Sequence, residues 1–325
     1  MIMKNILFCL SAIFAITFAS SCAENNVADV EVGPYTVSVI EKNVYHIQDC
    51  NSSYPAGMVV NEEGKFVNFN NCSDMYLVVG KKKALLIDLS NNIKWADNAA
   101  ESLRQLIAER SEGKELIVTF THNHGDHIGM LHAYTEDPDV QFALPENDFG
   151  MLIDRFPANQ CSLIKGGYVF DLGGKSVEVI DVPGHTNGSV AFYIQGRNIM
   201  FTGDAIGSGQ GVWIFNEAGY RQYASSVPSL VEWVENPSNG VDTDKLLIYG
   251  GHYWQKVGTP ELQNAEMGMT YLLDMQNLIN DIAAGTAATE PANLGRPGLD
   301  TYFRHGTATI VWNAEQAKAF AISVH

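Results

Sequence analysis

Residues 121–127 read Thr-His-Asn-His-Gly-Asp-His and place four potential metal ligands within six positions. Imidazole nitrogens and carboxylate oxygens suit zinc, and equally iron or manganese at a mixed nitrogen and oxygen site. This density of ionisable groups is far higher than the packing of a soluble domain requires. The stretch therefore predicts a metal site, with these ligands: His122, His124, Asp126 and His127.

Three more potential ligands follow downstream, each at the end of a predicted strand. His185 follows a Pro-Gly turn, Asp204 ends the run Phe-Thr-Gly-Asp, and His252 follows two glycines. Taken alone, each is as readily a cap or a satisfied polar group as a ligand. Together with the first cluster they make seven nitrogen and oxygen donors, all at strand ends, where ligands commonly gather in sheet proteins.

The elements that must position these residues are strands mixed with helices. Residues 115–120 are apolar and β-favouring, and 128–134 resemble the first turns of a helix, so the first cluster lies on a strand-to-helix turn. Further strands are predicted over 35–49 (two strands), 75–79, 84–88, 140–144, 168–182 (a hairpin), 189–194, 198–202, 245–249 and 307–312. Helices are predicted over 95–110, 227–234, 260–284 and 314–321, while 51–69 is left unassigned. The chain shows no solenoid repeat and no obvious linker, so we predict one α/β domain over 34–325, with two mixed sheets face to face and helices outside.

The motifs His-x-His-x-Asp-His, Pro-Gly-His, Thr-Gly-Asp and Gly-His occur here in one order, and the set resembles the metallo-β-lactamase fold superfamily of metallohydrolases over roughly residues 35–255. The resemblance implies an αββα sandwich with a metal site at one edge, between the sheets. It implies that a first zinc ion is held by His122, His124 and His185. A second would be held by Asp126, His127 and His252, with Asp204 bridging both.

Asp88 ends an early predicted strand. In relatives an aspartate at this point supports the site by holding a ligand or its loop. The alternative is that Asp88 only caps the following turn.

Two zinc ions, or iron or manganese in their place, could hold a hydroxide between them, because a metal lowers the pKa of bound water from roughly 15.7 towards about 7. That hydroxide would attack an electrophilic carbonyl, with one metal stabilising the oxyanion. Asp126 would also orient the nucleophile. We therefore expect a binuclear hydrolase with Asp126 and Asp204 as catalytic residues and no protein nucleophile.

The aspartate at position 204 bears on the substrate. True β-lactamases usually carry a cysteine there or lack a ligand, whereas an aspartate resembles glyoxalase-II-like thioesterases, lactonases and a phosphodiesterase branch. The formal net charge of −17 repels phosphate backbones, which disfavours nucleic acids and phosphodiesters. A single lysine in 253–256 disfavours glutathione. We predict that the substrate is a small-molecule ester, thioester or lactone; the alternative is a β-lactam.

Residues 205–215 combine glycines with two aromatic residues, Trp213 and Phe215. Glycines let a backbone approach a ligand closely, and aromatic rings give apolar contact area. We expect Trp213, with Tyr253 or Trp254, to wall the substrate pocket; the alternative is that these rings belong to the core.

Two other classes of protein stay open. A di-iron redox or metal-binding protein on this fold is disfavoured because no flavodoxin-like segment follows. A binding protein without turnover is disfavoured by the complete ligand set.

The first residues predict export. Lys4, an apolar run over 6–18 and the sequence Ala-Ser-Ser-Cys ending at Cys22 predict a lipoprotein-type signal peptide over 1–21, a lipidated Cys22 and a tether over 22–33. Ordinary secretion is the alternative. We expect a periplasmic, outer-membrane or cell-surface bacterial protein that touches the membrane only through this anchor.

The remaining cysteines are Cys50, Cys72 and Cys161. An odd number permits one disulfide at most, and Cys50 with Cys72 is the pair to test; three free thiols are equally compatible. The sequence does not determine the oligomeric state.

Overall fold

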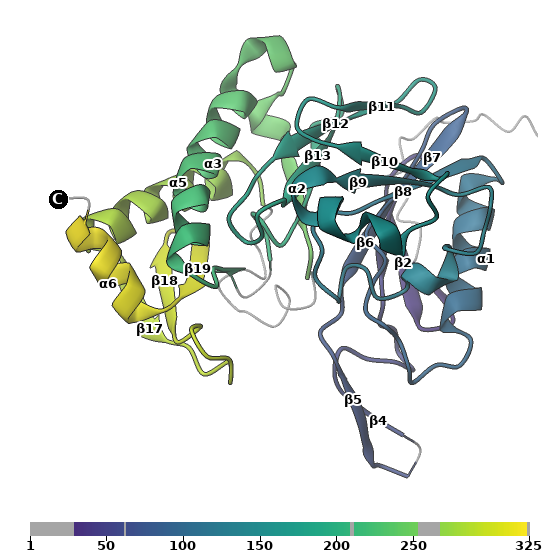
Figure 1. The fold of residues 1–325 in the computed structure, drawn as a ribbon, viewed down its shortest axis with the longest axis horizontal. Coiled ribbons are helices and arrows are strands. Elements are labelled where there is room, and N and C mark those ends of the chain that lie inside the picture. The colour runs from purple at the N-terminus through teal and green to yellow at the C-terminus, as the bar shows by residue number, and fades with distance from the viewer. Residues whose placement is uncertain (1–28, 62, 209–210, 253–266, 324–325) are drawn as a thin grey trace, which may run out of the picture.

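Two mixed β-sheets lie face to face at the centre of the fold (Figure 1). The structure is a computed structural model that describes residues 29–61, 63–208, 211–252 and 267–323. The first sheet has eight strands, in the order β1 (Val30–Val32), β2 (Tyr35–Glu41), β3 (Val44–Gln48), β6 (Asp74–Val79), β7 (Lys83–Ile87), β8 (Glu115–Thr119), β9 (Gln141–Pro145) and β10 (Cys161–Ile164). The second has five, in the order β11 (Val169–Asp171), β12 (Ser176–Asp181), β13 (Val190–Ile194), β14 (Ile199–Gly203) and β16 (Leu247–Gly250).

Both sheets change from antiparallel to parallel pairing along their width. In the first sheet the change occurs at β7, which pairs with β6 antiparallel and with β8 parallel. In the second, β14 pairs with β13 antiparallel and with β16 parallel. Parallel neighbours end at the same edge of a sheet, so the loops after β8, β14 and β16 can meet.

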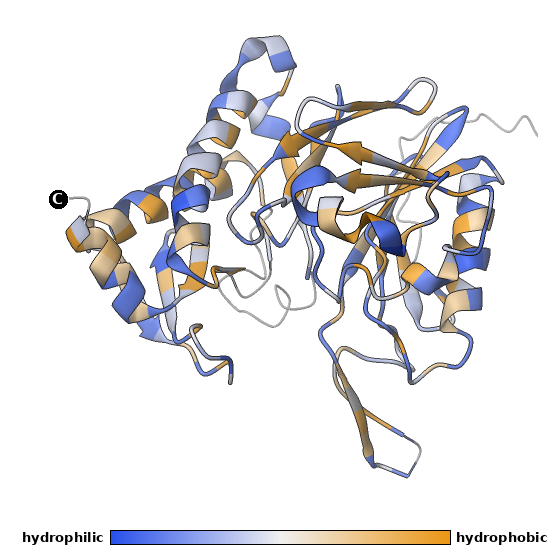
Figure 2. Cartoon of the chain, viewed as in Figure 1, coloured by the Kyte–Doolittle hydropathy of each residue, from blue (hydrophilic) through white to orange (hydrophobic). Residues whose placement is uncertain are grey.

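Apolar side chains fill the space between the sheets, where strands coloured as hydrophobic lie together in Figure 2. The rings of Tyr76 and Phe201 stack across this layer, with centroids 4.3 Å apart. Outside it, α1 (Ala99–Ser111) packs Leu103 and Leu106 onto the first sheet. On the other side, α3 (Glu217–Glu235) and α5 (Met269–Ala284) pack onto the second. The predicted αββα sandwich of two mixed sheets is confirmed.

A third sheet lies beyond α3 and α5, and the sequence did not predict it. Its strand order is β15 (Val212–Trp213), β19 (Ala308–Trp312), β18 (Thr301–His305) and β17 (Ala288–Pro291). The helix α6 (Ala314–Ser323) follows it, and Trp312 stacks on Tyr220 with centroids 4.3 Å apart. The unassigned residues 51–69 contain most of a hairpin, β4 (Gly57–Val60) and β5 (Phe66–Asn70), which projects from the body in Figure 1. The short helices are α2 (Glu146–Phe149), η1 (Leu131–Ala133), η2 (Gly150–Arg155), η3 (Pro237–Asn239) and η4 (Thr243–Lys245).

The helix predicted directly after the first cluster is wrong. Only the short η1 forms there, because the backbone of this segment bonds to another part of the chain. Leu89 N–H donates to the His127 carbonyl at 2.6 Å, and Gly129 N–H donates to the Ser90 carbonyl at 2.8 Å. A Cβ on Gly129 would collide with the backbone of residues 91–92.

Three other boundaries differ from the prediction. The helix α1 begins at Ala99 instead of residue 95. The helix α3 begins at Glu217 instead of residue 227 because Asn216 caps it, accepting from Gly219 N–H at 2.8 Å, and it ends at Glu235, one residue after the predicted end. The helix α5 begins at Met269, directly after Gly268; Pro260, its expected first turn, lies outside the described residues.

Part of the predicted tether is wrong, because Val30–Val32 form the strand β1 paired with β2. The predicted signal peptide and Cys22 lie outside the described residues. In the part that is described, none of the helices has the length and apolar character needed to cross a bilayer.

Candidate metal centre

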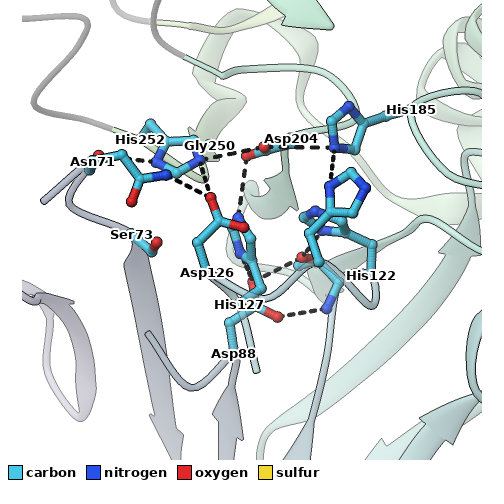
Figure 3. Close-up of polar contacts among 12 residues, drawn as sticks. Asn71, Ser73, Asp88, His122, Asp126, His127, His185, Asp204, Gly250 and His252 are labelled. Atoms are coloured by element: carbon cyan, nitrogen blue, oxygen red, sulfur yellow. Dashed lines mark hydrogen bonds and ion pairs between the residues drawn. The ribbon is translucent and has the colours of Figure 1, made fainter. Parts of the chain in front are cut away.

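All seven sequence-predicted ligands converge at one edge of the sandwich (Figure 3). The turn after β8 carries four of them, and the other three come from the loops that follow β12, β14 and β16. Because these loops come from both sheets, the site lies between the sheets, as the resemblance implied. The gathered residues are His122, His124, Asp126, His127, His185, Asp204 and His252.

Three histidines form the first group. A nitrogen from each of His122, His124 and His185 lies within 4.8 Å of the other two. The His185 Nδ1 bonds to the Trp213 carbonyl at 2.9 Å, and the other ring nitrogen, Nε2, lies 2.9 Å from His124 Nδ1. Because a carbonyl oxygen can only accept, the proton of the neutral ring is assigned to His185 Nδ1. The Nε2 atom then has a free electron pair that faces the other two histidines.

The second group is Asp126, His127 and His252, again within 4.8 Å. The His252 Nδ1 lies 3.2 Å from the carbonyl oxygens of both Asn71 and Cys72, while Nε2 lies 3.5 Å from Asp126 Oδ2. In both His252 and His127 the Nδ1 atom contacts a supporting oxygen and the Nε2 atom faces the cluster. That is the arrangement of metal-binding histidines, whose second nitrogen donates to a carbonyl or carboxylate.

Asp204 lies between the two groups, as Figure 3 shows. Its Oδ1 is 3.4 Å from His127 Nε2, and its Oδ2 is 3.6 Å from His185 Nε2 and 3.3 Å from His252 Nε2. One carboxylate therefore faces histidines of both groups, the position that a bridging ligand requires.

Asp88 holds the turn that carries the first cluster. Its Oδ1 accepts from Thr121 N–H at 2.7 Å, and its Oδ2 accepts from Thr121 Oγ1 at 2.7 Å and from His127 Nδ1 at 2.9 Å. The carboxylate is almost completely buried and does not enter the cluster. This geometry favours the supporting role over a simple turn cap.

Two glycines allow the strand ends to approach one another. Gly203 has φ +49°, and a Cβ there would lie 2.6 Å from Thr121 Cβ. A Cβ on Gly251 would lie 2.9 Å from His127 Cε1 and would collide with Asp204. A side chain at either position would push Asp204 away from the cluster.

The histidines differ in charge preference. Burial lowers the pKa of His185 to about 4, and it lowers the pKa of His122 well below its usual range. Burial also acts against a proton on His252, but the Asp204 and Asp126 carboxylates together outweigh it and raise the pKa to about 9. Burial likewise opposes ionisation of Asp204, yet His252 and His127 hold its pKa well below the usual value. The first group therefore favours neutral rings, while the second favours imidazolium beside carboxylate.

Buried polar atoms without partners indicate that a cation fits here. Among the described residues, His122 Nε2, His127 Nε2 and Asp204 Oδ1 are buried and make no hydrogen bond, although the last two face each other at 3.4 Å. Buried polar groups are nearly always satisfied, so three orphans aimed at one point need an occupant. Imidazole and carboxylate donors match zinc, iron or manganese.

A cavity of about 730 Å³ opens onto the cluster. Trp213 and Phe215 line it, and the Phe215 ring centroid lies 5.5 Å from the rings of His124 and His185. The predicted wall residue Trp213 is therefore at the site, whereas Tyr253 and Trp254 lie outside the described residues. A larger cavity, about 870 Å³ beside α6, has no histidine in its described lining, so we assign the chemistry to the first.

Two of the lining residues that sequence reasoning missed make contacts that bear on the site. Asn71 Nδ2 donates to Asp126 Oδ2 at 2.6 Å, and Arg296 lies over the Trp213 ring, 5.4 Å from its centroid. Among the described lining residues, Arg296 is the only lysine or arginine. Neither residue belongs to a motif. The only available signal was the polar run 70–73 next to a predicted strand.

Comparison with known proteins decides the family. Residues 73–236, about half of the chain, match the Metallo-beta-lactamase superfamily. The chain belongs to this superfamily. Its members usually bind metal ions, commonly zinc, which agrees with the donor set described above.

Relatives in this superfamily are hydrolases. A hydroxyacylglutathione hydrolase of Gloeothece citriformis is 30% identical over 232 residues, covering 67% of this chain and 82% of that protein. An atrochrysone carboxyl ACP thioesterase of Emericella nidulans is 29% identical over 153 residues, 47% of this chain and 46% of that protein. The chain spans half the length of a third relative, the hydroxyacylglutathione hydrolase of Prochlorococcus marinus, at 32% identity. This superfamily member is therefore an enzyme of the hydrolase class.

Solved structures confirm the fold. A metallo-beta-lactamase from Pontibacter korlensis aligns with a TM-score of 0.52 at 18% identity, covering 76% of this chain and 99% of that one. At this identity the likeness shows the fold alone. The expected superfamily and sandwich fold are both confirmed; the role of each ligand stays a prediction.

Proposed function

We propose that this hydrolase holds two divalent metal ions and cleaves a thioester. The observation that carries the proposal is the convergence of all seven donors in one cluster beside the cavity, with three of their buried atoms lacking partners. Two bound metal ions would lower the pKa of water and polarise a carbonyl oxygen. The side chains supply the rest of the chemistry.

The division of the donors supports two ions instead of one. His122, His124 and His185 would hold the first, and Asp126, His127 and His252 the second. Asp204 would bridge the two ions, because its carboxylate faces histidines of both groups. Zinc is the metal we propose, with iron or manganese as alternatives that the same donors accept.

Two neighbours would keep the second group in place. Asn71 Nδ2 donates to Asp126 Oδ2 and so orients that carboxylate beside His252. Asp88 accepts from His127 Nδ1, so that Nε2 is the nitrogen that would bind a metal once its proton is displaced. No serine or cysteine nucleophile is needed for this mechanism.

The relatives favour a thioester over an ester or lactone, since one is named a thioesterase and another hydrolyses an acylated glutathione. The cavity agrees, because Trp213 and Phe215 offer apolar area to an acyl chain. Arg296 would favour an acyl group that carries a carboxylate. The expectation against glutathione rests on residues 253–256, which lie outside the described residues.

A panel of matched substrates tests the proposal. The butanoyl thioester of N-acetylcysteamine, ethyl butanoate, γ-butyrolactone, a cephalosporin and a phosphodiester would be compared by kcat/KM, with metal content measured on the same protein. We expect the thioester to be cleaved fastest, and activity to disappear with a chelator and return with zinc. Fastest cleavage of the cephalosporin or phosphodiester, or thioester cleavage that resists metal removal, would contradict the proposal.

We also propose that the enzyme is exported and anchored through a lipid on Cys22. The basic, apolar and small-residue segments that end at Cys22 support this. Fractionation of cells that express the full chain tests it. The wild type should be found in membranes and Cys22→Ala should not, whereas equal membrane binding of the two would refute the anchor.

A further inference from the structure

Two cysteines meet at the base of the projecting hairpin. Cys50 follows β3, and Cys72 lies between β5 and β6, 22 positions later in the chain. Their Sγ atoms are 2.7 Å apart. This is closer than the roughly 3.5–4.0 Å preferred by non-bonded carbon atoms, which are smaller than sulfur, and approaches the bonded distance of about 2.05 Å. Both residues are present as thiols in the structure.

The backbone around both thiols is held in place. Cys72 N–H donates to Asn70 Oδ1 at 2.8 Å, and Asn70 Nδ2 donates to the Asp49 carbonyl at 2.8 Å. The Cys50 carbonyl accepts from Thr36 Oγ1 at 2.7 Å. Since the chain is fixed on both sides, the sulfurs could bond without rearrangement of the fold.

The turn that carries Cys72 also supports half of the metal centre. The carbonyl oxygens of Asn71 and Cys72 both lie 3.2 Å from His252 Nδ1. Asn71 Nδ2 donates to Asp126 Oδ2 at 2.6 Å (Figure 3). The backbone of Cys72 and its neighbour Asn71 therefore connects the Cys72 sulfur to two residues of the second ligand group, His252 and Asp126.

We propose that Cys50 and Cys72 form a reversible disulfide that fastens this turn and so stabilises the Asp126 and His252 half of the metal centre. The disulfide itself rests only on the positions of the sulfurs. Its effect on metal retention rests on the proposed function.

Thiol–disulfide exchange with a small disulfide such as oxidised glutathione balances the reaction. The half-buried Cys50, as thiolate, attacks one glutathione sulfur and releases one glutathione thiolate. The buried Cys72 then loses its proton, attacks the Cys50 sulfur and releases the second glutathione. One disulfide bond is broken and one is formed, and the two protons lost by the cysteines pass to the two glutathione thiols.

Peptide mapping tests the bond. The full chain would be incubated with oxidised glutathione or with a reductant, its free thiols alkylated, and its unreduced digest analysed by mass spectrometry. We expect a linked Cys50–Cys72 peptide after oxidation, with Cys161 alkylated as the internal control. Alkylation of Cys50 and Cys72 in the oxidised sample, or only mixed disulfides with glutathione, would overturn the proposal.

Two physical readouts test the coupling. In chelator-treated protein, oxidation should raise the melting temperature by about 5 °C. The rise should be absent in Cys50→Ser and kept in the matched variant Cys161→Ser. With zinc bound, oxidation should slow zinc transfer to a coloured chelator at least about threefold.

The outcomes separate the two proposals. A disulfide without slower zinc release would refute the coupling. Failure of the protein to bind zinc at all would refute the proposed function, while the peptide map and the melting temperature would still decide the disulfide. The wild type compared with itself under oxidant and reductant needs no variant to fold.

Discussion

Replacing Asp88 with asparagine tests how the turn of the metal centre is held. The side chain keeps its size but loses its charge and one of its two acceptor oxygens. Three donors now point at that carboxylate: Thr121 N–H, Thr121 Oγ1–H and His127 Nδ1–H. The threonine hydroxyl can rotate to accept from the new amide, but the two N–H groups cannot. Whichever way the amide turns, one of them loses its partner.

The cost follows from burial, because Asp88 is 1% exposed and His127 is fully buried. A buried donor without a partner costs about 1–3 kcal/mol, which should appear as lower stability of the metal-free protein. Loss of the partner that orients a metal-binding histidine lowers metal affinity roughly 10- to 100-fold. We expect binding of the ion proposed for the second group to weaken by that factor, since among the ligands only His127 contacts Asp88 directly, whereas His122 is linked to it through Thr121 Oγ1.

The assay is competition with a chelator of known zinc affinity, which should resolve the two binding steps that the proposed pair of ions predicts for the wild type. In Asp88→Asn the zinc affinity of the step assigned to the second group should fall. The affinity of the other step should stay within about threefold of the wild-type value, a margin small enough to distinguish it from a loss of roughly 10- to 100-fold. Asp281→Asn is the matched control, because Asp281 Oδ2 bonds to His305 Nδ1 at 2.6 Å outside the centre. If Asp88→Asn bound both ions as tightly as the control, Asp88 would not orient a ligand.

Further predictions address the other parts of the site. Asp204→Ala should lose bound metal and lower kcat/KM by at least about 100-fold, because loss of a residue that only supports a metal ligand already costs up to about 100-fold in activity. Full turnover with both metals would show the bridging assignment to be wrong. Trp213→Ala keeps the carbonyl that bonds to His185 but removes the aromatic wall, so KM should rise about 10-fold; unchanged substrate affinity would remove Trp213 from the pocket. Arg296→Gln should raise KM for a glutaryl thioester about 10-fold and leave the butanoyl thioester unaffected; equal effects on both would refute a charge-based role. The pKa of folded His252, about 9, lies above that of an unfolded histidine, so in the metal-free protein the stabilisation contributed by protonated His252 is complete below about pH 6.5, and on the order of 3 kcal/mol of it is lost as the pH rises through 9; a melting temperature that does not fall between these pH values would contradict this.

The motifs of the sequence were sufficient to predict the donors and the fold. Metal ligation depends on residue type, and four donors on one short turn are close in space in any fold. The remaining donors followed predicted strands, and the order of the motifs indicated one sandwich. Most strands of that sandwich were predicted because short apolar, β-favouring runs bounded by turn residues are a local property of the sequence; β1 and β10 were missed.

Tertiary structure decided what depends on contacts between distant parts of the chain. Asn71 bonds to Asp126 across 55 positions, and the Cys72 carbonyl meets His252 across 180. The helix expected after the first cluster failed because Gly129 bonds to Ser90 instead of to its own turn.

In the third sheet β17, β18 and β19 pair with their neighbours in sequence, whereas β15 joins through a long-range pairing with β19, a strand from near the end of the chain. The same long-range packing puts Arg296 over Trp213. The chemistry was determined locally by residue types, whereas the support of the ligands and the walls of the cavity arise only where separate segments pack together.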